Sequence, residues 1–163
     1  MKSVYGGLGN KMDVFLDTNV LVYAYDRSEP QKQRRALEVM EILAHRGLGV
    51  ISTQILGEFF NTVTRKLKPP LSLEHAQNLV LDFTRIFRVF PVTEAVVLEA
   101  VRGVQRYRFS YWDAQIWAVA RMHQIPLVFS EDFATGSAIE GVRFVNPFAE
   151  DFRVEAWIGE EGR

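Results

Sequence analysis

The sequence alternates between short apolar runs and longer segments with helical periodicity, and this alternation limits the possible folds. The apolar runs lie at 13–16, 49–52, 88–92, 126–130 and 143–145. Their length and their β-branched and aromatic residues are typical of buried strands. The segments between them repeat apolar residues every three or four positions, which favours amphipathic helices. Strands that alternate with helices form parallel sheets covered on both faces, so the pattern predicts one α/β domain with about five strands.

Capping and turn residues mark the ends of the expected helices. Asp17-Thr18-Asn19 separates the first apolar run from a short buried helix at 20–25. Gly47 ends a helix expected at 31–45, and Pro69-Pro70 end the helix that follows the second run. The hydroxyl residues that begin the remaining helices are Ser72, Thr93 and Ser110.

The composition fits a folded domain and excludes several functional classes. The chain has 163 residues, about the length of one domain, and 48% of them are hydrophobic. Its 19 Lys and Arg residues against 20 Asp and Glu residues give a net charge of −1. Neither disorder nor binding of nucleic acid by bulk positive charge is therefore expected. The absence of cysteine excludes disulfides, thiolate zinc sites and cysteine nucleophiles.

The expected domain has a short segment on either side. Residues 1–11 are glycine-rich, and we expect them to be a flexible arm or to precede a true start at Met12. The domain is expected at 12–148, with a tail at 149–163. The apolar stretch at 14–25 is too short to span a membrane and is interrupted by polar residues, which predicts a soluble cytoplasmic protein.

Four acidic residues fall where the carboxyl ends of parallel strands would meet. Asp17 directly follows the first apolar run, and Asp132 follows the fourth with one residue between. Asp113 lies in the first turn of the helix that leads back to the fourth run, and Glu58 lies about one and a half turns into the helix after the second. Ligands of open parallel sheets gather at this edge, so the four carboxylates are predicted to share one site.

Each of these acidic residues also has a purely structural interpretation. Asp17 suits a turn or a helix N-cap, and Asp132 suits a turn. Ser110 and Asp113 have the spacing of a capping box, and Glu58 could be an exposed helix residue. The placement of all four at one edge of the sheet favours the shared site.

A cluster of carboxylates needs protons or a cation. Two carboxylates about 5 Å apart repel by roughly 3 kcal/mol at an effective dielectric constant near 20. Oxygen ligands without histidine or cysteine favour Mg²⁺ or Mn²⁺, and such ions suit phosphoryl chemistry. The chain has no phosphate-binding glycine motif after a strand. The three histidines lie in helical segments without ligand spacing, and we expect them at the surface: His45, His75 and His123.

At these positions the sequence resembles the PIN-domain family, and within it the VapC-like toxin–antitoxin ribonucleases. The matching pieces, in the order of the family, are Phe15-Leu16-Asp17-Thr18-Asn19, Glu58-Phe59-Phe60-Asn61, Ser110-Tyr111-Trp112-Asp113-Ala114 and Ser130-Glu131-Asp132-Phe133. The resemblance covers roughly residues 12–147. It implies a three-layer α/β/α sandwich and a Mg²⁺- or Mn²⁺-dependent endoribonuclease, with an antitoxin that occupies the acidic groove and with a homodimeric assembly.

The resemblance also implies a role for each site residue. Asp17, Glu58, Asp113 and Asp132 correspond to the acidic quartet of the family. The metal ligands would be Asp17 and Asp113, with Asp132 binding directly or through water, and Glu58 would orient or deprotonate the attacking water. Asn19 and Ser130 resemble the polar residues that support the ligands. Thr18 or Asn19 could instead only cap the first helix. Gly57 departs from the pattern and would allow another segment to approach closely.

Binding of RNA would require local positive charge. Basic residues form two clusters in the sequence. The first cluster is Arg65, Lys66 and Lys68. The second is Arg102, Arg106 and Arg108, and it is close in the sequence to the aromatic residues Tyr107, Phe109, Tyr111 and Trp112. They could hold phosphates while an aromatic ring stacks on an unpaired base, or they could be solvated helix ends beside core aromatics.

Three other functions remain to be compared with a ribonuclease. A haloacid-dehalogenase-like phosphatase would need a second aspartate where the chain has Asn19. A receiver domain would need paired acids at the first strand and a lysine after the last, which are not seen. A non-catalytic PIN-like module that binds RNA or protein is disfavoured by the intact acidic quartet.

Overall fold

The computed structural model describes residues 12–133 and 135–160, and the arm expected at 1–11 lies outside the described residues. The strands are β1 (Val14–Leu16), β2 (Gly49–Ser52), β3 (Arg88–Phe90), β4 (Leu127–Phe129), β5 (Ala138–Ile139) and β6 (Val142–Val145). The helices are α1 (Thr18–Tyr23), α2 (Pro30–Arg46), α3 (Thr53–Arg65), α4 (Leu73–Ile86), α5 (Glu94–Tyr107), α6 (Tyr111–Met122) and α7 (Glu155–Ile158).

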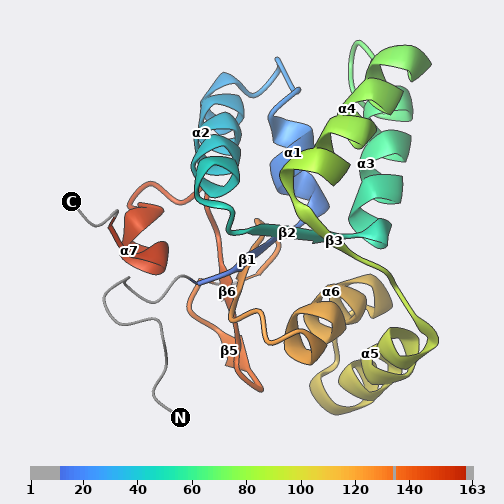
Figure 1. Ribbon diagram of the computed structural model, residues 1–163, viewed down its shortest axis with the longest axis vertical. Coiled ribbons are helices and arrows are strands. Elements are labelled where there is room, and N and C mark those ends of the chain that lie inside the picture. The colour runs from blue at the N-terminus through green and yellow to red at the C-terminus, as the bar shows by residue number, and fades with distance from the viewer. Residues whose placement is uncertain (1–11, 134, 161–163) are drawn as a thin grey trace.

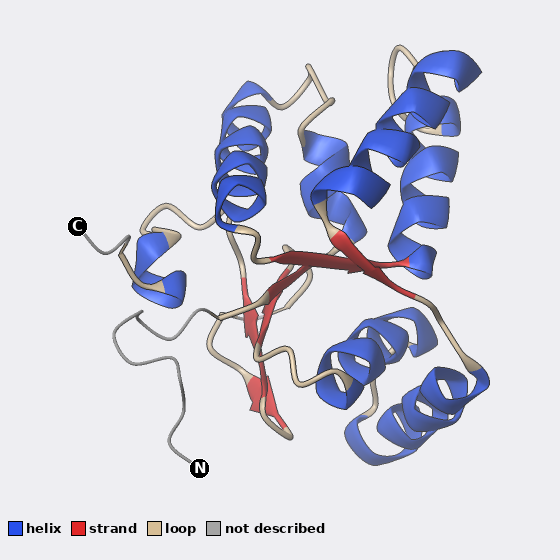
Figure 2. Cartoon of the chain, viewed as in Figure 1, coloured by secondary structure: helices blue, strands red, loops and turns tan. Residues whose placement is uncertain are grey.

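The elements form the predicted three-layer α/β/α sandwich. Helices α1 to α4 cover one face of the sheet, and α5 and α6 cover the other (Figure 1). The strand order is β3-β2-β1-β4-β6-β5, and every pairing is parallel except that of β5 with β6. The arrangement of strands and helices can be followed in Figure 2. All five predicted apolar runs are strands of the parallel part of this sheet.

The sixth strand, β5, is absent from the sequence prediction. It has two residues, which is too short to show a pattern of alternation, and it pairs with β6 through a tight turn. Glu140 and Gly141 in this turn have φ of 47° and 84°. Both values lie in the left-handed region that a type I′ hairpin turn requires. The sheet therefore has six strands rather than about five.

The order of the strands opens a crevice between β1 and β4. The chain passes from β1 to β2 and β3 in one direction, and then crosses the other face of the sheet to enter β4 on the opposite side of β1. The helix that follows β1 and the helix that leads into β4 therefore lie on opposite faces of the sheet. In open parallel sheets this reversal of direction is the usual position of a ligand site, at the carboxyl ends of the strands.

The segment after residue 148, expected as a tail, packs onto α2. Phe152, Val154 and Ile158 are buried. The Arg35 Nη1 atom donates to the carbonyl of Phe152 at 2.8 Å, and the Arg46 Nη1 atom donates to the carbonyl of Gly159 at 2.7 Å. The described part of this segment thus extends the core on the α2 side. Among the described residues, no helix combines the length and the apolar character needed to cross a membrane.

Helices α5 and α6 pack closely around a buried tryptophan. Trp117 is fully buried, and its Nε1 atom donates to the carbonyl of Ile139 in β5 at 3.1 Å. The rings of Tyr107 and Phe109 lie 5.7 Å from the Trp117 ring, so these two aromatics belong to the core. A Cβ atom at Gly103 would lie 2.8 Å from the Trp117 ring, so only glycine allows the two helices to approach this closely.

We predict that Gly103→Ala destabilises the protein although alanine is the better helix former. The added methyl group would have to displace the buried Trp117 ring, and overpacking of this kind costs about 1–3 kcal/mol. Gly57→Ala in α3 is the matched control, because a Cβ atom there would meet nothing within 4 Å. It should gain up to about 1 kcal/mol. Thermal denaturation of both variants tests this, and equal shifts in melting temperature would contradict it.

Candidate active site

The end of β1 places Asp17 at the crevice between the two central strands. Its backbone N–H donates to the carbonyl of Phe129 in β4 at 3.0 Å, which continues the pairing of the two strands by one residue. Its Oδ1 atom accepts from the N–H of Thr18 at 2.6 Å, so Asp17 is the N-cap of α1. The residue is only 4% exposed. The structural interpretation of Asp17 as a helix cap is therefore confirmed, and the same residue is the most buried carboxylate of the crevice.

Ser130 and Asn19 connect Asp17 to the loop after β4. The Ser130 hydroxyl donates to Asp17 Oδ2 at 2.6 Å and accepts from the backbone N–H of Asp132 at 3.1 Å. The Asn19 Nδ2 atom donates to Asp17 Oδ2 at 3.3 Å and to Asp132 Oδ2 at 3.4 Å. One amide group therefore holds two carboxylates together. Asn19 and Ser130 thus lie beside the carboxylates that the sequence predicted them to support.

Glu58 enters the crevice from α3 and is held by two donors. Its Oε2 atom accepts from the Thr18 hydroxyl at 2.7 Å, and its Oε1 atom accepts from Gln54 Nε2 at 2.9 Å. Thr18 therefore does not cap α1 with its side chain, because Asp17 is the cap and the Thr18 hydroxyl binds Glu58 instead. The expectation of a close neighbour at Gly57 is also wrong, since its Cβ position faces open space.

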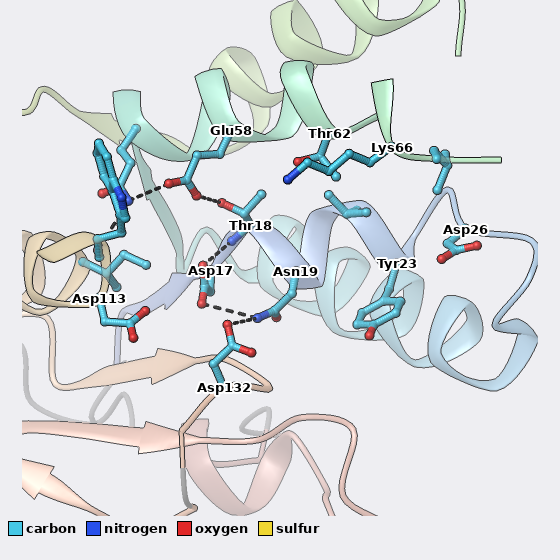
Figure 3. Close-up of a pocket in the computed structure, with 15 residues that line it drawn as sticks. Asp17, Thr18, Asn19, Tyr23, Asp26, Glu58, Thr62, Lys66, Asp113 and Asp132 are labelled. Atoms are coloured by element: carbon cyan, nitrogen blue, oxygen red, sulfur yellow. Dashed lines mark hydrogen bonds between the residues drawn. The ribbon is translucent and has the colours of Figure 1, made fainter. Parts of the chain in front are cut away.

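Asp113 completes the group from the opposite face of the sheet. Ser110 is the N-cap of α6, and its hydroxyl accepts from the N–H of Asp113 at 3.2 Å. The Asp113 carboxylate lies at the same groove as Asp17, Glu58 and Asp132 (Figure 3). The structure thus brings together all four acidic residues that the sequence selected, each from a different segment of the chain.

The four carboxylates line one open groove of about 530 Å³. The groove also contains residues that the sequence did not assign to the acidic site: Thr18, Val22, Tyr23, Asp26, Gln54, Thr62, Lys66, Leu67, Trp112 and Ile116. Of these, Lys66 and Trp112 belong to the basic and aromatic clusters considered for binding of RNA. Within residues 12–133 and 135–160, no three His, Asp or Glu side chains are arranged closely enough to bind a metal ion as they stand. The three histidines are exposed, as predicted.

Burial and mutual repulsion raise the pKa values of two of the carboxyl groups. Burial raises the pKa of Asp17 to about 6 from its usual value of 3.8, with smaller contributions from the charges of Asp132 and Glu58. Hydrogen bonds from Ser130 and Thr18 act in the opposite direction. Burial likewise raises the pKa of Asp113, again with Asp132 and Glu58 adding to the shift. The groove is thus a place where negative charge is costly in the absence of a cation.

Two glutamines form a hydrogen-bonded chain behind Glu58 that the sequence analysis missed. Gln115 Nε2 donates to Gln54 Oε1 at 2.7 Å, and Gln115 Oε1 accepts from the Tyr111 hydroxyl at 2.8 Å. Gln115 is only 5% exposed. The sequence did contain a sign of this chain, because Gln115 is a polar residue among the apolar residues of a buried helix. Such a side chain needs a hydrogen-bonding partner inside the protein.

Except for Lys66, the basic residues considered for contacts with RNA do not line the groove. Arg65, Arg106 and Arg108 are exposed at the ends of α3 and α5, and none of them lines the groove. Lys66, beside Arg65, does line it. Figure 3 shows the Lys66 side chain extended back along α3 past Thr62, in the direction of Glu58.

We predict that the stability difference between Asp17→Asn and the wild type depends on pH. With the pKa raised in the folded state, ionised Asp17 destabilises the fold, by about 3 kcal/mol once the pH is well above 6. As the pH falls from about 6 toward 4, Asp17 takes up a proton more readily in the folded state, and this cost disappears. Melting curves in EDTA from pH 4 to 8 should show the asparagine variant gaining on the wild type as the pH rises. If the difference in stability between the two proteins is the same at every pH in this range, the pKa of Asp17 is not raised in the folded state.

The fold is similar to that of several solved toxin–antitoxin proteins. A toxin–antitoxin complex from Klebsiella pneumoniae has a TM-score of 0.61 at 19% identity, over 83% of this chain and 98% of that one. VapC20 of Mycobacterium tuberculosis, described as a toxin that cleaves the sarcin–ricin loop, has a TM-score of 0.56 at 21% identity, over 80% of this chain and 99% of that one. DNA-bound VapBC from Salmonella typhimurium has a TM-score of 0.58 at 16% identity, over 82% and 96%.

A sequence comparison gives the family, although no curated protein sequence matches at a significant level. Residues 14–134, which contain Asp17, Glu58, Asp113 and Asp132, match the PIN domain family model. The match covers well over half of the chain, and the chain therefore belongs to the PIN domain family.

Proposed function

We propose that this protein is a Mg²⁺- or Mn²⁺-dependent endoribonuclease and the toxin of a toxin–antitoxin pair. The observation that carries the proposal is the convergence of Asp17, Glu58, Asp113 and Asp132 on one groove at the crevice between β1 and β4. Proteins with PIN domains are generally nucleases that use divalent ions. The comparisons support this proposal through the fold, since the similar structures are those of toxins and toxin–antitoxin complexes.

The donor set of the groove fits a hard divalent cation. Asp17, Asp113 and Asp132 offer carboxylate oxygens, which Mg²⁺ and Mn²⁺ prefer, and these three residues would hold the ion. The raised pKa values of Asp17 and Asp113 support this assignment, because a cation would remove the repulsion that contributes to them. When bound, the ion supplies charge stabilisation for the phosphate and lowers the pKa of a water molecule.

The remaining residues of the site position these groups. Ser130 and Asn19 fix the orientation of the Asp17 carboxylate, and Asn19 also holds Asp132. Glu58 is oriented at both oxygens, by Thr18 and Gln54, and we assign it the attacking water, from which it accepts a proton. The water oxygen bonds to phosphorus as the bond to the ribose 3′-oxygen breaks, and the 3′-oxygen takes up a proton from solvent. The products are a 3′-hydroxyl and a 5′-phosphate.

Binding of the RNA backbone is assigned to basic residues around the groove. Lys66 lines the groove, and we assign it a contact with a phosphate next to the scissile one. Arg65, Arg106 and Arg108 are proposed to contact the strand farther from the cleaved bond, because they are exposed but lie outside the groove. Such contacts would hold RNA through local charge although the net charge is −1.

The proposal includes a protein partner and a cellular location. An antitoxin would block the acidic groove, and a second copy of the chain would form a homodimer. Of the similar structures, two are VapBC proteins bound to DNA, from Rickettsia felis and Salmonella typhimurium. We place the protein in the cytoplasm, where its RNA substrate is found.

Removal of single carboxylates should abolish cleavage of RNA. Asp17→Asn and Asp113→Asn each remove a charge that would bind the ion, and we expect the rate of cleavage to fall more than about 100-fold. Asp82→Asn is the matched control, because Asp82 is an exposed carboxylate on α4 outside the groove. Cleavage of a labelled RNA is measured with Mg²⁺, with Mn²⁺ and with EDTA. Activity that survives EDTA or both groove variants would refute the proposed function, and hydrolysis of a phosphomonoester instead would indicate a phosphatase.

Binding of the ion should also stabilise the fold, independently of any activity. Mn²⁺ at about 100 times its dissociation constant adds about 2.7 kcal/mol, which corresponds to a rise in melting temperature of roughly 5–10 °C. Asp113→Asn should reduce this rise, whereas Asp82→Asn should show the same rise as the wild type. No rise in the wild-type protein would contradict a metal site in the groove, and a non-catalytic binding module would then be the better interpretation.

A further inference from the structure

An exposed tryptophan lies in the groove, and the proposed chemistry does not use it. Trp112 is 60% exposed and lines the groove together with the four carboxylates. The helix α6 that carries it is otherwise fully buried from Ala114 to Ala120. This exposed aromatic side chain does not contribute to packing of the core. Trp112 is also the residue next to Asp113 in the sequence, and both line the groove.

The position of Trp112 is fixed relative to the acidic residues. The Tyr111 ring meets the Trp112 ring edge-on, with the two centroids 5.1 Å apart and the planes at 74°. Tyr111 is itself held, because its hydroxyl donates to the buried side chain of Gln115 at 2.8 Å. The Tyr111 ring therefore supports the Trp112 ring.

Gln54 connects this aromatic pair to Glu58. Its Nε2 atom donates to Glu58 Oε1 at 2.9 Å and to the backbone carbonyl of Trp112 at 3.4 Å, and its Oε1 atom accepts from Gln115. The acceptor role of Oε1 fixes the orientation of the Gln54 amide, so that Nε2 must face Glu58. Gln54 thus fixes the position of Trp112 relative to Glu58, the residue to which we assign the attacking water.

Lys66 lies on the other side of the acidic residues. In Figure 3, Asp113 is at one end of the group and Lys66 is beyond Glu58 at the other. A strand laid along the groove would therefore meet an aromatic surface at the Asp113 end and a positive charge at the Lys66 end, with the carboxylates between them.

We propose that Trp112 stacks on an unpaired base of the substrate, next to the phosphodiester that lies over the acidic residues. The chemical class of substrate is then single-stranded RNA or a base turned out of a loop, because the faces of a base inside a duplex are already covered by its neighbours. This inference rests on the proposed function for the identity of the strand, and it adds how the strand is selected.

Binding without cleavage tests this proposal. The probe is a fluorescein-labelled single-stranded RNA of about 12 nucleotides in EDTA, compared with the same sequence as a duplex. Trp112→Leu should weaken binding of the single strand by roughly 5- to 100-fold and leave binding of the duplex nearly unchanged. Trp112→Phe should retain much of the affinity, because it keeps an aromatic face.

Two controls separate stacking from other effects. Leu98→Ala removes another apolar side chain, 63% exposed on α5 and outside the groove, and should not alter binding. Lys66→Gln should lower the dependence of affinity on salt, whereas Trp112→Leu should lower affinity without changing that dependence.

Quenching of tryptophan fluorescence by the single strand should occur in the wild type and be lost in Trp112→Phe, since Trp117 is buried and Trp157 lies at a different pocket.

The outcomes distinguish this proposal from the ribonuclease proposal. Equal binding of the single strand by wild type and Trp112→Leu, or equal losses for single strand and duplex, would overturn the stacking role whether or not the protein cleaves RNA. Equal binding would leave a protein partner as the occupant of the tryptophan surface. Failure of the wild type to cleave RNA would refute the ribonuclease while leaving the binding result to decide the role of Trp112.

Discussion

The pairing of β1 with β4 sets the position of the acidic groove. Leu16 is in register with Phe129, so the residues that follow the two strands, Asp17 and Ser130, lie side by side and bond through their side chains. Ser130 then fixes the backbone of Asp132. A slip of one residue in this register would turn every side chain of one strand to the opposite face and separate the pair. The site therefore depends on the central pair of strands and not on the loops alone.

At Asp17 the stability of the fold and the proposed function oppose each other. Its side chain caps α1 and accepts two further hydrogen bonds, yet burial beside other carboxylates raises its pKa to about 6. A neutral side chain could serve as a helix cap without that cost. The proposed cation would explain the carboxylate, because it would turn an unfavourable cluster of charges into a set of ligands.

The sequence was sufficient for the layers, the order of elements and the four carboxylates, because each depends on local periodicity and on the chemistry of strand ends. It failed where the decisive contact joins distant segments. β5 has only two residues, and its pairing with β6 depends on a tight turn rather than on an apolar pattern. Gln54 looks like any exposed helix residue until Gln115 and Glu58 are seen on either side of it. Arg106 and Arg108 lie near Asp113 in the sequence but do not line the groove, whereas Lys66, which follows α3, does line it.

A groove lined by carboxylates creates a problem for any nucleic-acid strand, because the field that would attract a cation repels phosphates. Basic side chains placed among the carboxylates would be neutralised by them and would compete with the ion, and the described part of the groove contains a single one, Lys66. A stacking contact is free of this conflict, since an indole ring carries no net charge and its attraction to a base does not depend on salt. The exposed face of Trp112 would thus provide affinity at the point where additional positive charge would weaken the proposed metal site.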